Sequence, residues 1–333
     1  MKDEASGKSE IKVSFLVPIY NAERFLTPCL ESLHTQTLKE IEVLCLNDGS
    51  SDNSLTIMRQ YAQKDSRFRI ISKKNTGYGD TMNQGIRGAC GEYIGIVEAD
   101  DFIEPDMAEF LYTHAQKYQA DIAKSDYYLY KHDRDWRQQL LPVTGDQPNL
   151  QVAQVEYLLT RPATIWTALY RREFLTEQQL SFLDLSDHRF QDSSFAFKTL
   201  ACAHRVYYTT RAFYHYRQHP GQSVVSRAYP TAILKEYQET ERFLRERGSL
   251  QDWAAALTLA KFYGYKWNTA RLPYSIARKF VTLATSDWKK MQAEEIYQTR
   301  LFSWRESFDT FLARRLPEAF IIKAKLARWK ERG

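Results

Sequence analysis

Residues 93–101 read Tyr-Ile-Gly-Ile-Val-Glu-Ala-Asp-Asp, and this stretch decides the fold of the chain. Its apolar first half is typical of a short strand buried on both faces, and three carboxylates follow within four residues. Taken alone, such a triplet is most simply a solvated loop of surface acids, because unpaired acids are costly to bury. Its position after a core strand favours a site instead, because ligands of open α/β sheets bind outside the carboxyl ends of strands. Oxygen ligands there suit Mg²⁺ or Mn²⁺, and such an ion suits a diphosphate.

Three further strand patterns precede this stretch, and each is followed by a polar loop and a helical pattern. We expect strands at residues 12–18, 41–46 and 68–72, with helices at about 22–38, after residue 52 and at about 80–89. The alternation of strands and helices predicts a parallel sheet with right-handed crossovers. Every strand ends in a polar, glycine- or acid-bearing loop at the same edge. The sequence therefore predicts one site assembled from four loops.

The rest of the chain divides into a mixed region and a helical region. We expect helices at 105–120, 152–160 and 193–202, strands at 121–130, 164–170 and within 205–216, and a loop over the site at 134–150. From about residue 228 the pattern changes to long helices with few turn signals. The predicted organisation is a polar tail (1–10), an α/β domain (11–225) and a helical C-terminal region (226–333).

Composition limits the classes of partner. The chain has 333 residues, with 44% hydrophobic and 26% charged residues, as in an ordinary globular protein. Its net charge of +5 is too small to argue for a nucleic-acid partner. Its four cysteines show neither metal-type spacing nor a pairing pattern, and two of them, Cys45 and Cys90, have surroundings that predict an interior position. A reduced, cytoplasmic protein is the simplest interpretation.

Membrane contact is left open by the sequence. Residues 1–10 lack the apolar core of a signal peptide, and no run of about 18 apolar residues exists to span a bilayer. Residues 314–332, however, combine seven Lys or Arg with interspersed apolar residues. Such a basic amphipathic helix is a candidate for contact with the inner membrane face, and packing against the body of the protein explains the pattern equally well.

Five motifs, taken together, resemble the family 2 glycosyltransferases, which share the nucleotide-sugar-binding GT-A fold. They are residues 17–23 (Val-Pro-Ile-Tyr-Asn-Ala-Glu), residues 47–52 (Asn-Asp-Gly-Ser-Ser-Asp), Asn75 with Gly77 and Asn83, the acidic residues 98–101, and the pair Gln191 and Asp192. Each motif alone is weak, but all five come in the order and at the separations usual for the family. The resemblance covers about residues 11–225 and implies a GT-A (Rossmann-like) sheet flanked by helices.

The resemblance implies which residues bind the nucleotide. The base and ribose would be held by Pro18, Tyr20, Asn21, Glu23 and Asp48. Carboxylates suit this role because they accept hydrogen bonds from a uracil N–H or from ribose hydroxyls. Capping of a turn explains Asp48 as well, and both roles can hold together.

Further donor contacts follow from the next two motifs. The resemblance adds Asn75, Gly77, Asn83, Glu98 and Ala99 to the nucleotide-sugar site, with Glu98 facing the ribose. A glycine allows the backbone to approach a ligand closely, although a turn needs no ligand to explain one.

The remaining implied roles concern the reaction. Asp100 would bind Mn²⁺ or Mg²⁺, with Asp101 as a second ligand or as support nearby, and Arg217 would contact the diphosphate. Asp192 would be the catalytic base for a single inverting displacement, although capping of a helix explains this residue equally well. Trp166 would line the acceptor sugar, against a slightly stronger expectation of core packing.

Three residues depart from the family pattern. Glu98 stands where an Asp is commoner, Gln191 replaces the acid that usually precedes the base, and Met82 replaces a frequent arginine. The first changes the geometry of a ribose contact, the second changes the field at Asp192, and the third puts in doubt a phosphate contact from that helix.

The implied activity is transfer of a sugar, from a UDP-hexose or UDP-N-acetylhexosamine donor, to a glycan or lipid-linked acceptor in surface polysaccharide or glycoconjugate synthesis. A catalytically inactive nucleotide-sugar-binding subunit is the first alternative, and the presence of Asp192 argues against it. A nucleotidyltransferase would need a Gly- and Lys-rich phosphate loop after the first strand, and a dehydrogenase would need Gly-x-Gly-x-x-Gly there. Residues 18–23 match neither pattern.

Overall fold

The structure is a computed structural model that describes residues 11–184, 190–219 and 231–330. For residues 329 and 330 it describes the backbone but not the side chains. These residues form two compact units. The first takes its residues from 1–150, 164–186 and 202–218, and the second from 151–163, 187–201 and 219–333. The predicted domain boundary near residue 225 stays a prediction.

Four parallel strands build one half of the sheet in the first unit. They are β1 (Val13–Ile19), β2 (Ile41–Asp48), β3 (Phe68–Lys73) and β4 (Tyr93–Ile96), in the order β3-β2-β1-β4. The central strands β1, β2 and β4 are buried almost throughout, as their continuous apolar runs predict. Gly95 lets β4 approach β1, because a Cβ on this residue would lie 2.7 Å from the Phe15 ring.

Later strands extend the sheet on the other side of β4. They are β8 (Ala168–Arg171), β6 (Ile122–Lys131), β9 (Val206–Arg217) and β5 (Phe102–Ile103), joined in this order. The β4–β8, β8–β6 and β9–β5 pairs are antiparallel, whereas β6 and β9 are parallel. The predicted α/β fold is therefore confirmed, and the sheet as a whole is mixed.

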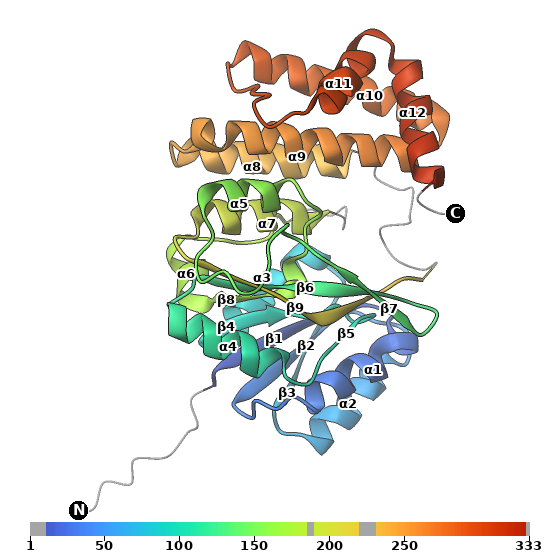
Figure 1. The fold of residues 1–333 in the computed structure, drawn as a ribbon. Coiled ribbons are helices and arrows are strands. Elements are labelled where there is room, and N and C mark those ends of the chain that lie inside the picture. The colour runs from blue at the N-terminus through green and yellow to red at the C-terminus, as the bar shows by residue number, and fades with distance from the viewer. Residues whose placement is uncertain (1–10, 185–189, 220–230, 331–333) are drawn as a thin grey trace, which may run out of the picture. The chain divides into compact units, whose positions relative to one another are not determined.

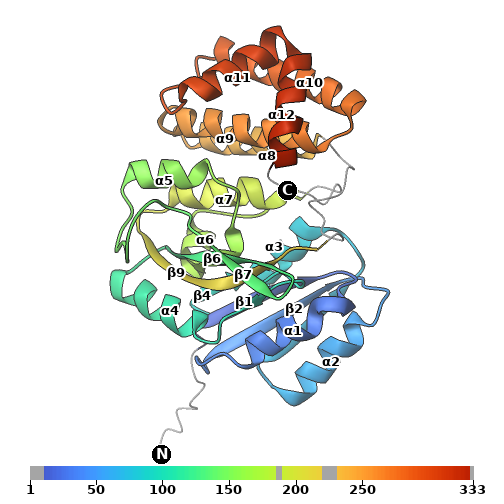
Figure 2. The same ribbon diagram turned by 45° about the vertical axis from the view of Figure 1, so that its right-hand side comes forward.

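Helices cover both faces of this sheet. Figures 1 and 2 show α3 (Tyr78–Gly88) on one face and α1 (Glu23–His34), α2 (Ser54–Lys64) and α4 (Met107–Tyr118) on the other. The buried positions of α1 include Leu26, Leu30 and Leu33, which recur at helical spacing. The short helix α6 (Arg172–Glu177) follows β8.

Two predicted segments differ from the structure. Residues 134–150 were predicted to be a loop, but the segment starts with β7 (Arg134–Gln138), which forms a hairpin with β6. The prediction missed β7 because nearly all its residues are exposed, so that it lacks an apolar alternation. The predicted strand at 164–170 is a short 3-10 helix, η1 (Ile165–Thr167), followed by β8. Cys45 is buried as expected, but Cys90 is exposed.

The second unit is helical. It contains α5 (Val152–Leu159), most of α7 (Gln191–Cys202), α8 (Ala232–Glu246), α9 (Leu250–Arg271), α10 (Tyr274–Ala293), α11 (Trp304–Arg315) and α12 (Pro317–Lys330). In Figure 1, α8 and α9 run side by side. A search of the described residues finds no helix with both the length and the apolar character needed to cross a membrane.

The predicted basic helix at 314–332 is divided between two elements. Arg314 and Arg315 end α11, and α12 begins at Pro317, where the proline starts a new helix. One side of α12 is taken up by packing, because Phe320, Ile321 and Ala324 are buried. The Trp329 side chain lies outside the described residues.

Candidate functional site

Hydrogen bonds connect the loops that follow β1 and β2. The Asn21 side chain accepts a hydrogen bond from the Ser51 backbone N–H at 2.8 Å, and the Glu23 carboxylate accepts one from the Asn53 N–H at 2.8 Å. The Asp52 carboxylate in turn accepts one from the Glu23 N–H at 3.0 Å. Residues predicted to bind a nucleotide thus hold these two loops together. Beside them, the Tyr20 ring is 56% exposed and open to a ligand.

Asp48 connects the β2 loop to the loop after β3. Its carboxylate accepts hydrogen bonds from the backbone N–H groups of Thr76 at 2.9 Å and Gly77 at 3.0 Å. Gly77 has φ +102°, a conformation that favours glycine. Both explanations of Asp48 remain compatible, because each carboxylate oxygen has more than one acceptor site.

Lys73 is a site residue that the sequence analysis missed. Its ammonium group pairs with Asp48 and lies 3.3 Å from the Asp80 carboxylate. A hydrogen bond from Thr76, together with Lys73, lowers the pKa of the Asp80 carboxyl below its ordinary value. The available signal was its position, since Lys73 ends β3 at the edge where the other loops meet.

The acidic loop after β4 is joined to the third loop and to β9. The Glu98 carboxylate accepts a hydrogen bond from the Tyr78 hydroxyl at 2.7 Å, and the Glu98 N–H donates to the Tyr214 hydroxyl at 3.0 Å. Tyr214 then donates to the Asp101 carboxylate at 2.7 Å. The four loops, including the departure at Glu98, therefore meet at one edge of the sheet.

Asp100 and Asp101 differ in their surroundings. Asp101 is fully buried, and its second carboxylate oxygen accepts a hydrogen bond from the Arg217 N–H at 2.8 Å. Burial and the adjacent Asp100 charge raise the pKa of Asp101 well above its ordinary value. Asp100 is half-buried, and its backbone carbonyl accepts a hydrogen bond from Arg217 Nε at 2.8 Å. Arg217 therefore lies beside the acidic loop, and its contact with a diphosphate stays a prediction.

The carboxylates of the acidic loop are oxygen ligands of the kind that a divalent cation takes. Among the described residues, no group of three or more His, Cys, Asp or Glu side chains is arranged to hold a metal ion alone. Mg²⁺ and Mn²⁺ commonly bind through one or two carboxylates and take their other ligands from water and substrate phosphates. Asp100 and Asp101 are the aspartates of this loop, and both carboxylate oxygens of the buried Asp101 accept hydrogen bonds.

Three other predicted or considered residues lie in protein contacts. The Asn83 amide exchanges two hydrogen bonds with the Phe182 backbone, at 3.0 and 2.9 Å. The Trp166 ring is 8% exposed and stacks on Tyr214 with ring centroids 4.2 Å apart. His215 bonds through its two ring nitrogens to Asp135 and Glu104. Met82, one of the departures from the family pattern, is buried.

Asp192 belongs to the second unit, where it occupies the first turn of α7. Although part of the residue is exposed, desolvation of the carboxyl group raises the pKa of Asp192 to about 6. Gln191, immediately before it, is buried. A carboxylate with such a pKa is matched to accepting a proton near neutral pH.

Glu236 on α8 is a second residue that the sequence analysis missed. Its carboxyl group is fully buried and accepts a hydrogen bond from the Ser194 N–H, in the first turn of α7, at 3.2 Å. Burial first, and then the Asp192 charge, raise the pKa of Glu236 to about 8. No local motif marks this residue, because it reaches α7 only through the packing of α8.

The fold and the joined loops define a class, the GT-A-like proteins that bind ligands at the carboxyl edge of a parallel sheet. The sequence profile described as Glycosyl transferase family 2 matches residues 14–178. A Bacillus subtilis (strain 168) protein named as a glycosyltransferase, EpsH, is 33% identical over 252 residues, which cover 74% of this chain and 72% of the relative. The chain belongs to the family 2 glycosyltransferases, as its motifs predict, and it is thereby an enzyme of the glycosyltransferase class.

Two solved structures share the fold. The structure of S. aureus TarS 1-349 in complex with UDP-GlcNAc has a TM-score of 0.65 at 18% identity, covering 96% of this chain and 92% of that chain. The mannosyltransferase PcManGT from Pyrobaculum calidifontis, in complex with GDP-Man and Mn²⁺, has a TM-score of 0.52 at 16% identity, covering 97% of this chain and 88% of that chain.

Proposed function

We propose that this chain transfers a hexose or N-acetylhexosamine from a UDP-sugar to an acceptor hydroxyl, with inversion and with the help of a divalent cation. The observation that carries the proposal is the connection of all four strand-end loops through Asn21, Glu23, Asp48 and Glu98. These hydrogen bonds hold the donor residues in place before a nucleotide binds, which reduces the entropic cost of binding. The UDP-GlcNAc and GDP-Man complexes of proteins with this fold support a nucleotide-sugar donor.

We assign the donor contacts by position along the connected loops. Pro18 and the exposed Tyr20 contact the base, while Asn21, Glu23 and Asp48 shape its pocket and present acceptors to the base and ribose. Asn75, Gly77, Glu98 and Ala99 continue the pocket toward the ribose and diphosphate. Asn83 acts through its hydrogen bonds to Phe182. Trp166 supports the pocket from the aromatic core rather than binding the acceptor.

The leaving diphosphate is stabilised from two sides. A bound Mn²⁺ or Mg²⁺ at Asp100 supplies Lewis-acid neutralisation of the departing charge. Arg217 places a guanidinium, which suits phosphate oxygens, next to the Asp100 backbone. Asp101 holds the Arg217 backbone and Tyr214, so that its role is to keep the loop in shape.

Asp192 is the proposed base. It takes the proton from the acceptor hydroxyl as the oxygen attacks the anomeric carbon and the bond to the diphosphate breaks. Its pKa of about 6 leaves most of the carboxyl ionised at pH 7 and still basic enough to accept a proton.

Glu236→Gln should change the dependence of stability on pH. Because the folded-state pKa of Glu236 is raised to about 8, the folded protein binds a proton that the unfolded chain releases. The free energy of unfolding should therefore fall, by about 1.4 kcal/mol per pH unit, as pH rises from the ordinary glutamate pKa toward 8. Gln mimics the protonated acid and should remove this slope in pH-resolved denaturant titrations. Glu239→Gln provides no control, because the Glu239 side chain is mostly buried and pairs with Lys198. Glu246→Gln is the better comparison, because Glu246 is exposed on the same helix. An unchanged slope in Glu236→Gln would contradict the assignment.

The acceptor and setting are proposed from the same family membership. We infer a glycan or lipid-linked acceptor in surface polysaccharide or glycoconjugate synthesis, a cytoplasmic location, and peripheral contact with the inner membrane face. The basic residues that end α11 and continue through α12 support this contact.

A thermal-shift screen of nucleotide sugars, with and without Mn²⁺, tests the donor assignment. A UDP-sugar at about 100 times its Kd should stabilise the protein by about 2.7 kcal/mol. We expect this shift for UDP-sugars, only weakly for GDP-sugars, and with a marked loss when EDTA removes Mn²⁺. A shift by GDP-sugars alone, or one that is insensitive to EDTA, would contradict the donor or the metal assignment, respectively.

A further inference from the structure

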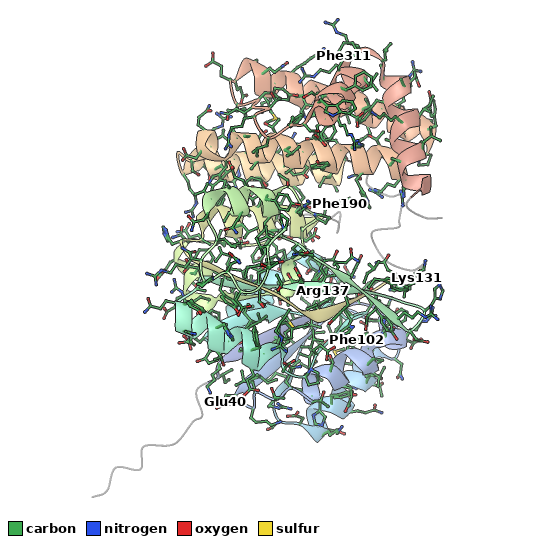
Figure 3. All side chains as sticks on the ribbon, in the orientation of Figure 1. Glu40, Phe102, Lys131, Arg137, Phe190 and Phe311 are labelled. Atoms are coloured by element: carbon green, nitrogen blue, oxygen red, sulfur yellow. The ribbon has the colours of Figure 1, made fainter. Side chains whose placement is uncertain are left out.

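An aromatic stripe runs along the surface of α11. Trp304, Phe308 and Phe311 are 73%, 47% and 53% exposed. Their spacing of four and three residues places them on one side of the helix, and Arg315, four residues further on, ends the same line. Figure 3 labels Phe311 on this helix. Three exposed aromatic side chains in a row are unusual on the surface of a soluble protein and indicate a contact surface.

The charged residues that are fully exposed on α11 are both positive. The exposed residues of α11 are Trp304, Arg305, Ser307, Phe308, Phe311 and Arg315, which include two arginines and no acid. The two acids of the helix both have partners within the protein. Asp309 is 2% exposed and pairs with Lys266 and Lys323, while Glu306 accepts hydrogen bonds from Ser303 and Tyr263. Lys323 also lies 4.9 Å from the Phe308 ring centroid.

A hollow of about 400 Å³ opens beside the stripe. Its walls come from both sides of the turn before α11 and from the helix itself: Tyr297, Thr299, Phe302, Ser307, Thr310, Phe311, Arg314 and Arg315. The hydroxyl groups of Ser307 and Thr310 already donate to carbonyl groups of their own helix. The positive charge in this wall is therefore supplied by the two arginines.

Arg314 lacks a counter-ion among the residues that the structure describes. Its Nε and Nη2 are buried without a hydrogen-bond partner, and its guanidinium lies 4.7 Å from the Tyr297 ring centroid and 6.0 Å from that of Trp288. The rings attract the cation, and the Tyr297 side chain also forms a hydrogen bond with this arginine. Buried donors without partners are rare in folded proteins, and Nε and Nη2 leave this cation with capacity for an anion beside it.

We propose that α11 lies on an anionic lipid surface, with its aromatic stripe in the headgroup region and a lipid phosphate in the hollow beside Arg314 and Arg315. This inference refines the membrane contact of the proposed function, because it moves the contact from the basic α12 to the exposed side of α11. It does not depend on the roles of Asp100 and Asp192.

A lipid surface fits this helix better than a second copy of the chain does. A symmetric contact between two α11 helices would bring arginines of like charge together, with no exposed acid on either helix to pair with them. A phosphate-rich surface complements the arginines. Trp and Phe flanked by Arg or Lys are also the side chains that interfacial helices insert at the headgroup boundary.

Vesicle flotation of the full chain tests the proposal. We expect binding to vesicles of equal parts phosphatidylglycerol and phosphatidylcholine at least about tenfold tighter than to phosphatidylcholine alone. The triple change Trp304→Ser, Phe308→Ser and Phe311→Ser should lower binding to both by about tenfold or more. The double change Arg314→Gln and Arg315→Gln should remove the preference for phosphatidylglycerol. Matched controls are Tyr274→Ser for an exposed aromatic and the pair Arg242→Gln and Arg245→Gln for exposed arginines, all in the same unit.

Several outcomes would overturn the proposal. One is equal binding to the two kinds of vesicle, or the same loss in the controls as in the α11 variants. Another is dimer formation, seen as a doubling of the mass in solution with rising concentration, that the triple change alone prevents. That result would assign the stripe to contact with a second copy of the chain. Inorganic phosphate or glycerol phosphate that stabilises the protein through Arg314, without any vesicle binding, would assign the hollow to a soluble ligand. Nucleotide binding, measured in parallel, keeps a failure of this proposal distinct from a failure of the donor site.

Discussion

Asp192→Asn is expected to lower sugar transfer by about a hundred- to ten-thousandfold, the range over which general acid–base catalysis contributes to rates. The amide keeps the size of the side chain and its place in the first turn of α7 but cannot accept the acceptor's proton. Binding of the UDP-sugar should remain within about a factor of two, because the donor residues lie in the first unit. Single-turnover transfer and calorimetric donor binding measure the two quantities separately.

The pH dependence of transfer by the unmodified enzyme provides a second test of the role of Asp192. Since the pKa of Asp192 is about 6, kcat should fall tenfold for each pH unit below that value and level off above it. Asp252→Asn is the matched control, because Asp252 is also in the first turn of a helix of the second unit but is exposed. Transfer by Asp192→Asn at the rate of Asp252→Asn would remove Asp192 from the mechanism. A loss of both transfer and folding, seen as a lowered Tm, would indicate that Asp192 stabilises α7. The helix begins at Gln191, so Asp192 lies inside its first turn and does not cap it.

The parallel half of the sheet could be predicted because its information is local. The runs in β1, β2 and β4 are apolar without interruption, and each ends in turn residues at the same edge. The antiparallel half could not be predicted in the same way. Its order, β8-β6-β9-β5, depends on pairings between strands that are not consecutive in the chain. Only packing decides such pairings, and short patterns such as that of β5, with two residues, carry no periodic signal.

The site was predictable as a set of motifs but not as a set of contacts. The motifs identify Asp100 and Asp101 as neighbours, yet their environments differ because Asp101 accepts a hydrogen bond from the buried Tyr214, 113 residues away. Glu236 shows the same limit, since it reaches the first turn of α7 from 42 residues further along the chain. Residues of this kind have no spacing rule, and only the folded chain shows which acid each of them neighbours.

Asp100→Asn and Asp101→Asn are expected to have different effects, because we assign different roles to these two acids. Loss of the proposed metal ligand should weaken Mn²⁺-dependent UDP binding by about tenfold or more, since perturbing a metal site typically costs this much in affinity. Asp101→Asn should instead affect stability. The two oxygens of Asp101 accept hydrogen bonds from the Tyr214 hydroxyl and from the Arg217 N–H. An Asn side chain has one acceptor oxygen and can keep only one of these bonds, so the free energy of unfolding should fall by about 1–3 kcal/mol.

Calorimetric titration of UDP at several Mn²⁺ concentrations, with denaturant unfolding of each variant, distinguishes the two roles. In Asp100→Asn the dependence of UDP affinity on Mn²⁺ should be lost while the unfolding midpoint stays near that of the unmodified protein. In Asp101→Asn the dependence on Mn²⁺ should persist while the midpoint falls. Equal loss of Mn²⁺ dependence in both variants would make Asp101 a ligand in its own right, in spite of its burial. Unchanged dependence in Asp100→Asn would mean that the cation is bound elsewhere or is not needed.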